Sequence, residues 1–338
     1  MKDKVLFQNK IGNRGIILTL AVVLAMLLSG CFPAKPKVYK VGILSGSEAF
    51  TTITDGFKAG MADLGYVEGE NITYDVQQPA SFDEWQPVIE QFVADEVDLI
   101  FAFPGEPAEV AKAVTQGTDI PVVFVLGAVE TGKLVESVRQ PGGNITGVRF
   151  PLPENTTKRF EILLELAPQT KRLLIEYNPS YANNPIVLET LRPVAASAGV
   201  TLVEEPTGDL EKLQANLQAR AALDDIGVDA IMLMPEVLSQ TPDGLAIIIP
   251  FAKEHGLPIA GAMPYTADLG AVFSYTGDNV EMGRLAASSA DKILKGTPAG
   301  EIPVLTPEQE LRINYKVAQE LGLTVPESLL NQAAEIIR

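Results

Sequence analysis

Short, almost wholly apolar segments that alternate with helical patterns constrain this chain more than any other feature. DLIFAF at 98–103 and PVVFVL at 121–126 contain hardly any polar residue. A strand that is apolar on both faces must be covered on both sides, as in a parallel sheet with helices on each face. The spacing of apolar residues in the same half predicts strands at 38–45 and 72–77, and helices at 51–64, 82–95 and 106–116.

The same alternation begins again after the turn sequence PGGN at 141–144. Strands are expected at 171–177, 200–204, 229–234 and 258–262, and helices at 185–198, 210–223 and 245–255. The sequence therefore predicts the α/β class, with two lobes of similar size that each contain a parallel sheet flanked by helices. A strand at 271–275 and a helix at 278–294 follow, and the pattern alone does not assign them to either lobe.

The N-terminal segment has the pattern of an export signal. Several basic residues precede an apolar run at 16–28 that only Thr19 interrupts. This run is shorter than the roughly 20 residues that a membrane-spanning helix needs. Leu28-Ser29-Gly30-Cys31 ends the run and resembles a bacterial lipobox, in which the cysteine is lipidated and the peptide is cut just before it. We expect a signal peptide at 1–30, a lipid on Cys31 and a tether at 31–37.

Charge and the scarcity of histidine and cysteine exclude several classes of function. The formal net charge is −17, and the mature part is more acidic still because the signal segment is basic. Binding to nucleic acid is not expected, since phosphates require clustered Lys and Arg. His255 and Cys31 are the only residues of their types, so ordinary zinc sites lack their ligands. A Ser–His–Asp centre would need His255, which stands in the last turn of a predicted helix, and the chain has no GxSxG motif. No GxGxxG motif is present, and no cofactor is expected.

The loops that follow the predicted strands hold the candidate ligand-binding residues, because ligands of open α/β sheets lie beyond the carboxyl ends of the strands. Carboxylates, small polar groups and aromatic rings gather in these loops. The candidate set is Ser45, Ser47, Glu48, Glu106, Gly127, Ser180, Tyr181, Asn183, Glu236, Tyr265, Tyr275 and Asp278. Three of the acidic members, Glu48, Glu106 and Asp278, also stand at predicted helix starts, where the helix dipole alone favours a carboxylate.

Longer segments of the chain, taken jointly, resemble a known family. DGFKAGMADLGYVEGENITYDVQ, VADEVDLIFA, LVESVRQPGGNITGV, ILLELAPQTKRLLIEYNPSYANN and INYKVAQELGLTVPESLL look like the ABC transporter substrate-binding proteins, a family that includes tryptophan-binding lipoproteins. The resemblance implies a type I periplasmic-binding-protein fold, in which a three-segment hinge links two Rossmann-like lobes that enclose the ligand. It assigns 38–148 and 272–303 to the N-terminal lobe, and 149–271 and 304–338 to the C-terminal lobe. The crossings would lie near 147–151, 270–276 and 301–306.

The resemblance also implies roles for individual residues. YNPSYANN is similar to the family's YNPSEANS, which makes Ser180 and Asn183 donors to a ligand carboxylate and leaves Glu236 as an acidic counterpart. Tyr181 and Glu106 stand where the family has other residues, and the aspartate that would bind an ammonium group is missing near Gly127. The framework therefore matches the family, whereas the loops that would form the pocket differ from it.

Together these observations predict a solute-binding component of an ABC importer and not an enzyme. The protein would be an exported bacterial lipoprotein, monomeric and anchored to the extracytoplasmic face of the cell membrane. It would capture a small organic solute such as an amino acid and deliver it to an ABC permease and its ATPase. Two alternatives remain open: a ligand-sensing lipoprotein that signals to a sensor kinase, and a hydrolase that uses Glu236 with a second cleft carboxylate.

Overall fold

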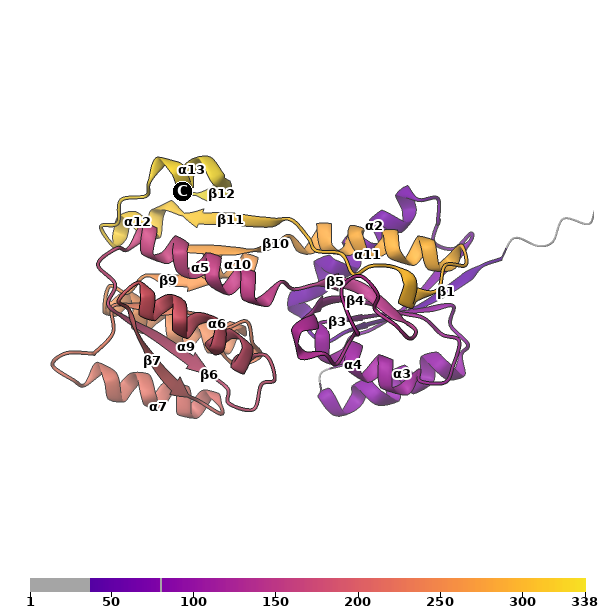
Figure 1. Ribbon diagram of the computed structural model, residues 1–338, viewed down its shortest axis with the longest axis horizontal. Helices are drawn as coiled ribbons and strands as arrows, with labels where there is room; N and C mark the ends of the chain where they lie inside the picture. Colours follow the sequence, from indigo (N-terminus) through magenta and orange to yellow (C-terminus); the bar gives the residue numbers. More distant parts are fainter. Residues whose placement is uncertain (1–36, 80) are drawn as a thin grey trace, which may run out of the picture. The chain divides into compact units, whose positions relative to one another are not determined.

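Two β-sheets organise the chain in the computed structural model, which describes residues 37–79 and 81–338 (Figure 1). One sheet has five parallel strands in the order β2-β1-β3-β4-β5. The other has seven strands in the order β12-β11-β10-β9-β8-β6-β7, of which β11 and β12 run opposite to the rest. The predicted α/β class with two lobes is confirmed. The signal peptide at 1–30 and the lipid on Cys31 lie outside the described residues, as does the tether apart from Lys37.

The first sheet follows the strand pattern read from the sequence. Its strands are β1 (Tyr39–Ser45), β2 (Ile72–Gln77), β3 (Leu99–Phe103), β4 (Val122–Gly127) and β5 (Ile145–Arg149). Its helices are η1 (Glu48–Phe50), α2 (Thr51–Asp63), η2 (Phe82–Glu84), α3 (Trp85–Ala94), α4 (Gly105–Val114), η3 (Val129–Thr131), α11 (Asn279–Leu294) and η4 (Ala299–Glu301).

Strand β3, at the centre of this sheet, shows why its sequence is apolar throughout. Every residue of β3 is buried. Phe101 stacks on Phe57 of α2, whereas its neighbour Ile100 lies in the core cluster that contains Ile89 of α3. Successive side chains of a strand point to opposite faces. Both faces of this strand are therefore covered by helices, as the sequence predicted.

Helices α2 and α11 lie side by side over the first sheet, although more than 200 residues separate them in the chain (Figure 1). Glycine makes this close approach possible. A Cβ atom at Gly56 of α2 would lie 2.1 Å from the carbonyl oxygen of Val280, and one at Gly283 of α11 would lie 2.2 Å from that of Ile53. Both distances are far below van der Waals contact, so neither position tolerates a side chain without displacement of the helices.

After the first crossing of the chain, strands and helices alternate again and form the second sheet. Its strands are β6 (Arg172–Tyr177), β7 (Thr201–Pro206), β8 (Ala230–Met232), β9 (Ile259–Gly261), β10 (Phe273–Gly277), β11 (Gln309–Asn314) and β12 (Ala333–Ile337). The helices that follow or flank them are α5 (Leu152–Leu166), α6 (Asn184–Ser197), α7 (Leu210–Ala221), α8 (Val237–Gln240), α9 (Pro242–Glu254), α10 (Pro264–Leu269), α12 (Tyr315–Glu320) and α13 (Glu327–Gln332).

The assignment of 272–277 to the N-terminal lobe is wrong. Strand β10 pairs in parallel with β9 and antiparallel with β11, which places it in the seven-stranded sheet. The helix that follows it, α11, packs on the first sheet, against α2, β4 and β5, and η4 contacts β5 as well. The chain therefore crosses after Gly277, because the ladder with β11 continues to that residue. The family resemblance implies a crossing near 270–276, just before the end of this ladder.

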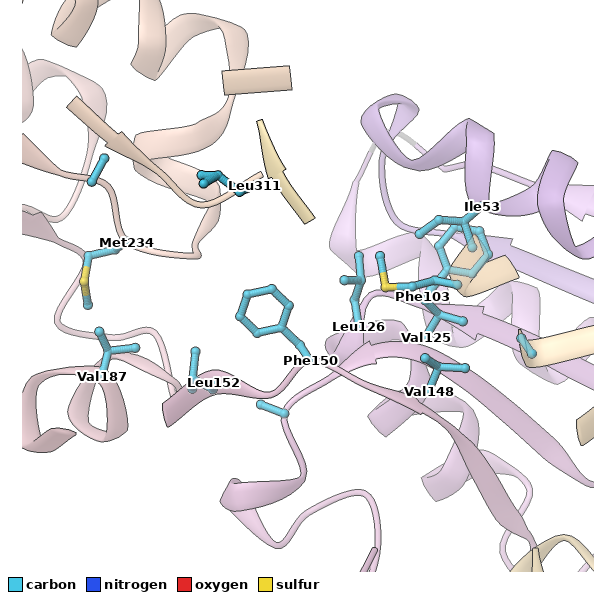
Figure 2. Close-up of a cluster of buried hydrophobic side chains, with 14 of the residues drawn as sticks. Ile53, Phe103, Val125, Leu126, Val148, Phe150, Leu152, Val187, Met234 and Leu311 are labelled. Carbon is cyan, nitrogen blue, oxygen red and sulfur yellow. The ribbon is translucent and has the colours of Figure 1, made fainter. Parts of the chain in front are cut away.

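The other two crossings lie side by side. The first leaves β5 at Phe150, and the third returns from η4 into β11. The backbone N–H of Arg149 donates to the carbonyl of Leu305 at 2.9 Å, and Arg149 Nε donates to Thr306 Oγ1 at 2.9 Å. Figure 2 shows the ring of Phe150 beside Leu126, in a hydrophobic cluster that also includes Leu152. These contacts hold the first and third crossings against each other where the chain passes between the two sheets.

Within the described ranges, none of the helices combines the length and the apolar character that crossing a bilayer requires.

Candidate functional site

Glu236 is the most deeply buried carboxylate of the candidate set. It follows β8 and is 5% exposed. Its Oε1 and Oε2 accept the backbone N–H of Asn178 at 2.9 and 3.1 Å, and Oε2 also accepts Asn184 Nδ2 at 2.9 Å. Burial raises the pKa of Glu236, and the hydrogen bonds from Asn184 and Asn178 lower it in part. The buried carboxylate therefore holds the loop between β6 and α6 in place through hydrogen bonds to Asn178 and Asn184.

Tyr181 lies on that loop and approaches the other lobe at the first turn of α4. The side chains of Glu106 on α4 and of Asn183 lie near its hydroxyl. Burial raises the pKa of Tyr181 most strongly, and the charges of Glu106 and Glu236 raise it further. Four members of the candidate set thus meet here: Glu106, Tyr181, Asn183 and Glu236.

The polar groups after β1 mainly shape their own loop. Ser45 is buried, and its hydroxyl donates to the carbonyl of Ser47 at 3.0 Å. The hydroxyl of Ser47 accepts the N–H of Ala49 at 3.3 Å and caps η1. Glu48 is exposed in the first turn of that short helix. The two serine hydroxyls are already used within the loop, and Glu48 is the member of this loop that remains available.

The contacts of Gly127 and Ser180 are made by their backbone atoms. A Cβ atom at Gly127 would lie 2.5 Å from Cδ1 of Leu134 and 2.6 Å from Cδ2 of Phe124, so a larger residue here would have to displace these side chains. The carbonyl of Gly127 accepts the N–H of Phe150 at 3.0 Å, which ties the end of β4 to the first crossing. Ser180 is exposed, and its backbone N–H donates to Asn178 Oδ1 at 2.9 Å.

A cavity of about 380 Å³ lies where the end of β10 meets the starts of α2 and α11. It brings together Tyr265 and Asp278 of the candidate set, and burial raises the pKa of Tyr265 to about 12. Its lining residues are Ala49, Thr52, Pro264, Tyr265, Asp268, Thr276, Gly277, Asp278, Asn279, Val280, Glu310, Arg312 and Glu335.

Tyr275 does not join this cavity, although it precedes a residue that does. It packs against the hydrophobic core, and burial, followed by the charge of Glu161 on α5, raises its pKa. Thr276 lines the cavity, as does Glu310, its partner in β11. Adjacent residues of a strand face opposite sides, so only one of Tyr275 and Thr276 could face the cavity.

The candidate set missed several residues of the site. Asn178 and Asn184 hold Glu236, and Asn279, Glu310 and Arg312 line the cavity. Among residues 37–79 and 81–338, no group of three or more His, Cys, Asp or Glu side chains is arranged to hold a metal ion. The chemistry that the described site offers is therefore hydrogen bonding and charge, in loops that approach from both sheets.

Comparison with known proteins gives consistent results for almost the whole chain. The family model described as "ABC transporter substrate binding protein" matches residues 40–337. A tyrosine-binding protein of Clostridioides difficile (strain R20291) is 30% identical over 275 residues, which cover 79% of this chain and 76% of the relative.

Solved structures resemble the fold. A domain from Streptococcus pneumoniae in complex with L-Trp has a TM-score of 0.78 at 24% identity, over 89% of this chain and 100% of the other. A domain from Vibrio cholerae O1 biovar El Tor has the same TM-score of 0.78 at 27% identity, with the same coverage of 89% and 100%. A ligand-free, open substrate-binding protein from Clostridium difficile has a TM-score of 0.71 at 24% identity, over 89% of this chain and 99% of the other.

Proposed function

The chain belongs to the ABC transporter substrate-binding protein family, and from this premise we propose that it binds an aromatic α-amino acid between its lobes. Members of this family bind solutes and are not enzymes, so the alternative of a hydrolase based on Glu236 is wrong. The geometry agrees with this rejection, because both oxygens of Glu236 already accept hydrogen bonds from the loop that they support.

One observation carries the choice of solute, namely the 30% identity with a tyrosine-binding protein over 79% of this chain. Tyr181 and Tyr265 supply aromatic surface at the strand ends, and aromatic rings pair favourably with one another. In this proposal Ser180 and Asn183 bind the solute carboxylate. Because Glu106 of the other lobe lies near Tyr181, a solute beside Tyr181 would contact both lobes, as ligand-driven hinge closure requires.

The proposal includes export, anchoring and delivery. A lipid on Cys31, after cleavage of the signal peptide at 1–30, would hold the protein at the extracytoplasmic face of the membrane. There the protein, as a monomer, would present its solute to an ABC permease and its ATPase. The sensor alternative differs only in the partner, and cross-linking in cells distinguishes the two, since a permease or a kinase would be captured.

Thermal unfolding of the purified protein tests the proposed solute. L-Tyrosine, L-tryptophan or L-phenylalanine at about 100 times its Kd should stabilise the protein by about 2.7 kcal/mol, which raises Tm by about 4 °C in a chain of this length. D-Ribose should leave Tm unchanged. Tyr181→Phe, which keeps the ring and removes the hydroxyl that lies near Glu106, should weaken binding several-fold. If none of the twenty common amino acids raises Tm, the proposal is rejected.

A further inference from the structure

One aromatic side chain stands exposed at the edge of the first sheet that also holds the candidate loops. Phe82 is 65% exposed, and no other aromatic side chain within the described ranges is open to solvent to this degree. Phe82 follows β2, which runs parallel to β1, as β3 does on the other side. The carboxyl ends of parallel strands meet at one edge of a sheet. The segment that carries Phe82 therefore lies at the same edge as the loops after β1 and β3.

A second aromatic ring supports Phe82 from the protein side. Trp85 is 6% exposed, and the centroids of the two rings lie 4.7 Å apart with their planes at 73°, an edge-to-face contact. The turn of η2 is closed by the N–H of Glu84, which donates to the carbonyl of Ser81 at 3.1 Å. Such a contact with Trp85 leaves at least one face of Phe82 uncovered by Trp85. Phe82 thus presents a supported apolar surface to solvent.

This aromatic pair adjoins the loops on which the proposed solute depends. A Cβ atom at Gly46 would lie 3.0 Å from Cγ of Pro107 and 3.3 Å from Cζ2 of Trp85. The Trp85 ring therefore lies beside the loop after β1 and the first turn of α4, and Figure 1 shows α3 and α4 side by side. Glu106, in that same turn, lies near Tyr181 of the second lobe. The start of α4 thus adjoins both Trp85 and Tyr181.

We propose that Phe82 is a specificity-determining residue, whose exposed face packs against the aromatic ring of the bound amino acid while Trp85 supports it. Ser180 and Asn183, which hold the solute carboxylate in the proposed function, stand on either side of Tyr181 in the chain. From there the solute side chain extends past the start of α4 towards Phe82. This inference rests on the proposed function, since it states where the ring of the amino acid lies.

A protein partner fits this surface less well than a small aromatic solute. The neighbours of Phe82 in the chain, Ser81 and Asp83, are polar and exposed, and so is Glu84. A docking surface for a protein normally contains a contiguous apolar patch of several hundred Å². A single ring among polar neighbours is enough for one aromatic side chain, because a ring pair contributes beyond the area that it buries.

The test compares L-phenylalanine with β-cyclohexyl-L-alanine, which keeps the amine and the carboxylate and replaces the aromatic ring by a saturated one. Calorimetric titration should show that the wild-type protein binds L-phenylalanine about fivefold more tightly, as expected for one aromatic pair. Phe82→Leu, which keeps an apolar side chain and removes the ring, should reduce this ratio to less than about twofold. Phe82→Tyr, which keeps the ring, should preserve it.

A matched control separates the ring from a general loss of apolar surface. Leu64 is 43% exposed and stands between α2 and β2, at the amino ends of the strands, so Leu64→Ala should leave the affinity ratio unchanged. Because Phe82 lies at the surface, Phe82→Leu should change Tm without ligand by less than about 1 °C. A folded Phe82→Leu protein with the wild-type affinity ratio would overturn the inference.

Trp85 provides a second, local readout, because it is the only tryptophan of the chain. Saturation with L-phenylalanine should change the emission of Trp85 under excitation that is selective for tryptophan, with half of the change at the calorimetric Kd. Unchanged emission at saturation would contradict a solute ring that lies against Phe82.

The failure of the inference and of the proposed function can be told apart. If L-phenylalanine binds to the wild type and the affinity ratio is the same in Phe82→Leu, only the placement of the solute ring is wrong. If Phe82→Leu then also loses uptake of the solute by cells, the exposed ring contacts the transporter instead. If no amino acid binds to the wild-type protein, the proposed function fails and the inference that depends on it fails too.

Discussion

Truncation of Glu236 is the sharpest test of how the site is held together. In the wild type, the two carboxylate oxygens of Glu236 accept the backbone N–H of Asn178 at 2.9 and 3.1 Å. In Glu236→Ala this N–H loses its acceptor. Asn184 Nδ2 loses one of its two acceptors and keeps the carbonyl of Asn178 at 2.7 Å. The variant should therefore loosen the loop between β6 and α6 without removing any core side chain.

The expected size of the effect follows from these contacts. Loss of hydrogen bonds to a charged group costs about 1.5–3 kcal/mol each, and the orphaned amide adds to this. Release of a buried carboxylate offsets part of the loss, because burial disfavours its charge. We expect a net loss of about 2 kcal/mol in the free energy of unfolding, which corresponds to a fall of about 3 °C in Tm.

The pH dependence gives this prediction a signature of its own. Burial raises the pKa of Glu236 in the folded state above its ordinary value of 4.5. The native state therefore binds the proton more tightly than the unfolded state, and this group contributes most stability below pH 4.5. The contribution falls as pH rises through the folded-state pKa. The stability difference between wild type and Glu236→Ala should accordingly be larger at pH 4 than at pH 7.

Urea denaturation at both pH values measures the difference, and Ser180→Ala on the same loop is the matched control. The Ser180 side chain is exposed, and the backbone N–H that contacts Asn178 is kept, so this control should change stability by less than about 0.5 kcal/mol. A loss below about 1 kcal/mol in Glu236→Ala, or a difference that is larger at pH 7 than at pH 4, would refute the reasoning.

Three further changes have definite expected outcomes. Cys31→Ala should move the protein from the membrane fraction to the soluble fraction of cells, as seen by fractionation and immunoblotting, because the anchor would be lost. Gly56→Ala should reduce the free energy of unfolding by about 2–3 kcal/mol, since its Cβ would meet the Val280 carbonyl, whereas Gly208→Ala, with open space around it, should be nearly neutral in the same urea titration. Arg159→Met should raise the urea midpoint by an amount equivalent to about 1–2 kcal/mol. The guanidinium of Arg159 is fully buried, burial lowers its pKa to about 9, and its Nε and Nη2 lack partners among the described residues. A lower midpoint would contradict this prediction.

The parts of the fold that the sequence predicted are those set by local pattern. The predicted strand at 72–77 has the bounds of β2, and the predicted strand at 98–103 lies within one residue of β3. Apolar runs of this kind identify a covered strand wherever it lies. They do not predict which strands it pairs with, as β10 illustrates. AVFSY fits either sheet, and the choice was made by pairing with β11, more than 30 residues farther along the chain.

The same limit explains which site residues the sequence missed. The candidate set came from the carboxyl ends of strands, a rule that assumes parallel strands and that includes Tyr265 and Asp278, which line the cavity. Strand β11 runs antiparallel to β10, so its amino end lies beside the carboxyl end of β10. Glu310 and Arg312 therefore reach the cavity from the start of a strand, where the rule does not look. The charges at this cavity thus depend on a reversal of chain direction, and such a reversal is set by contacts between distant segments.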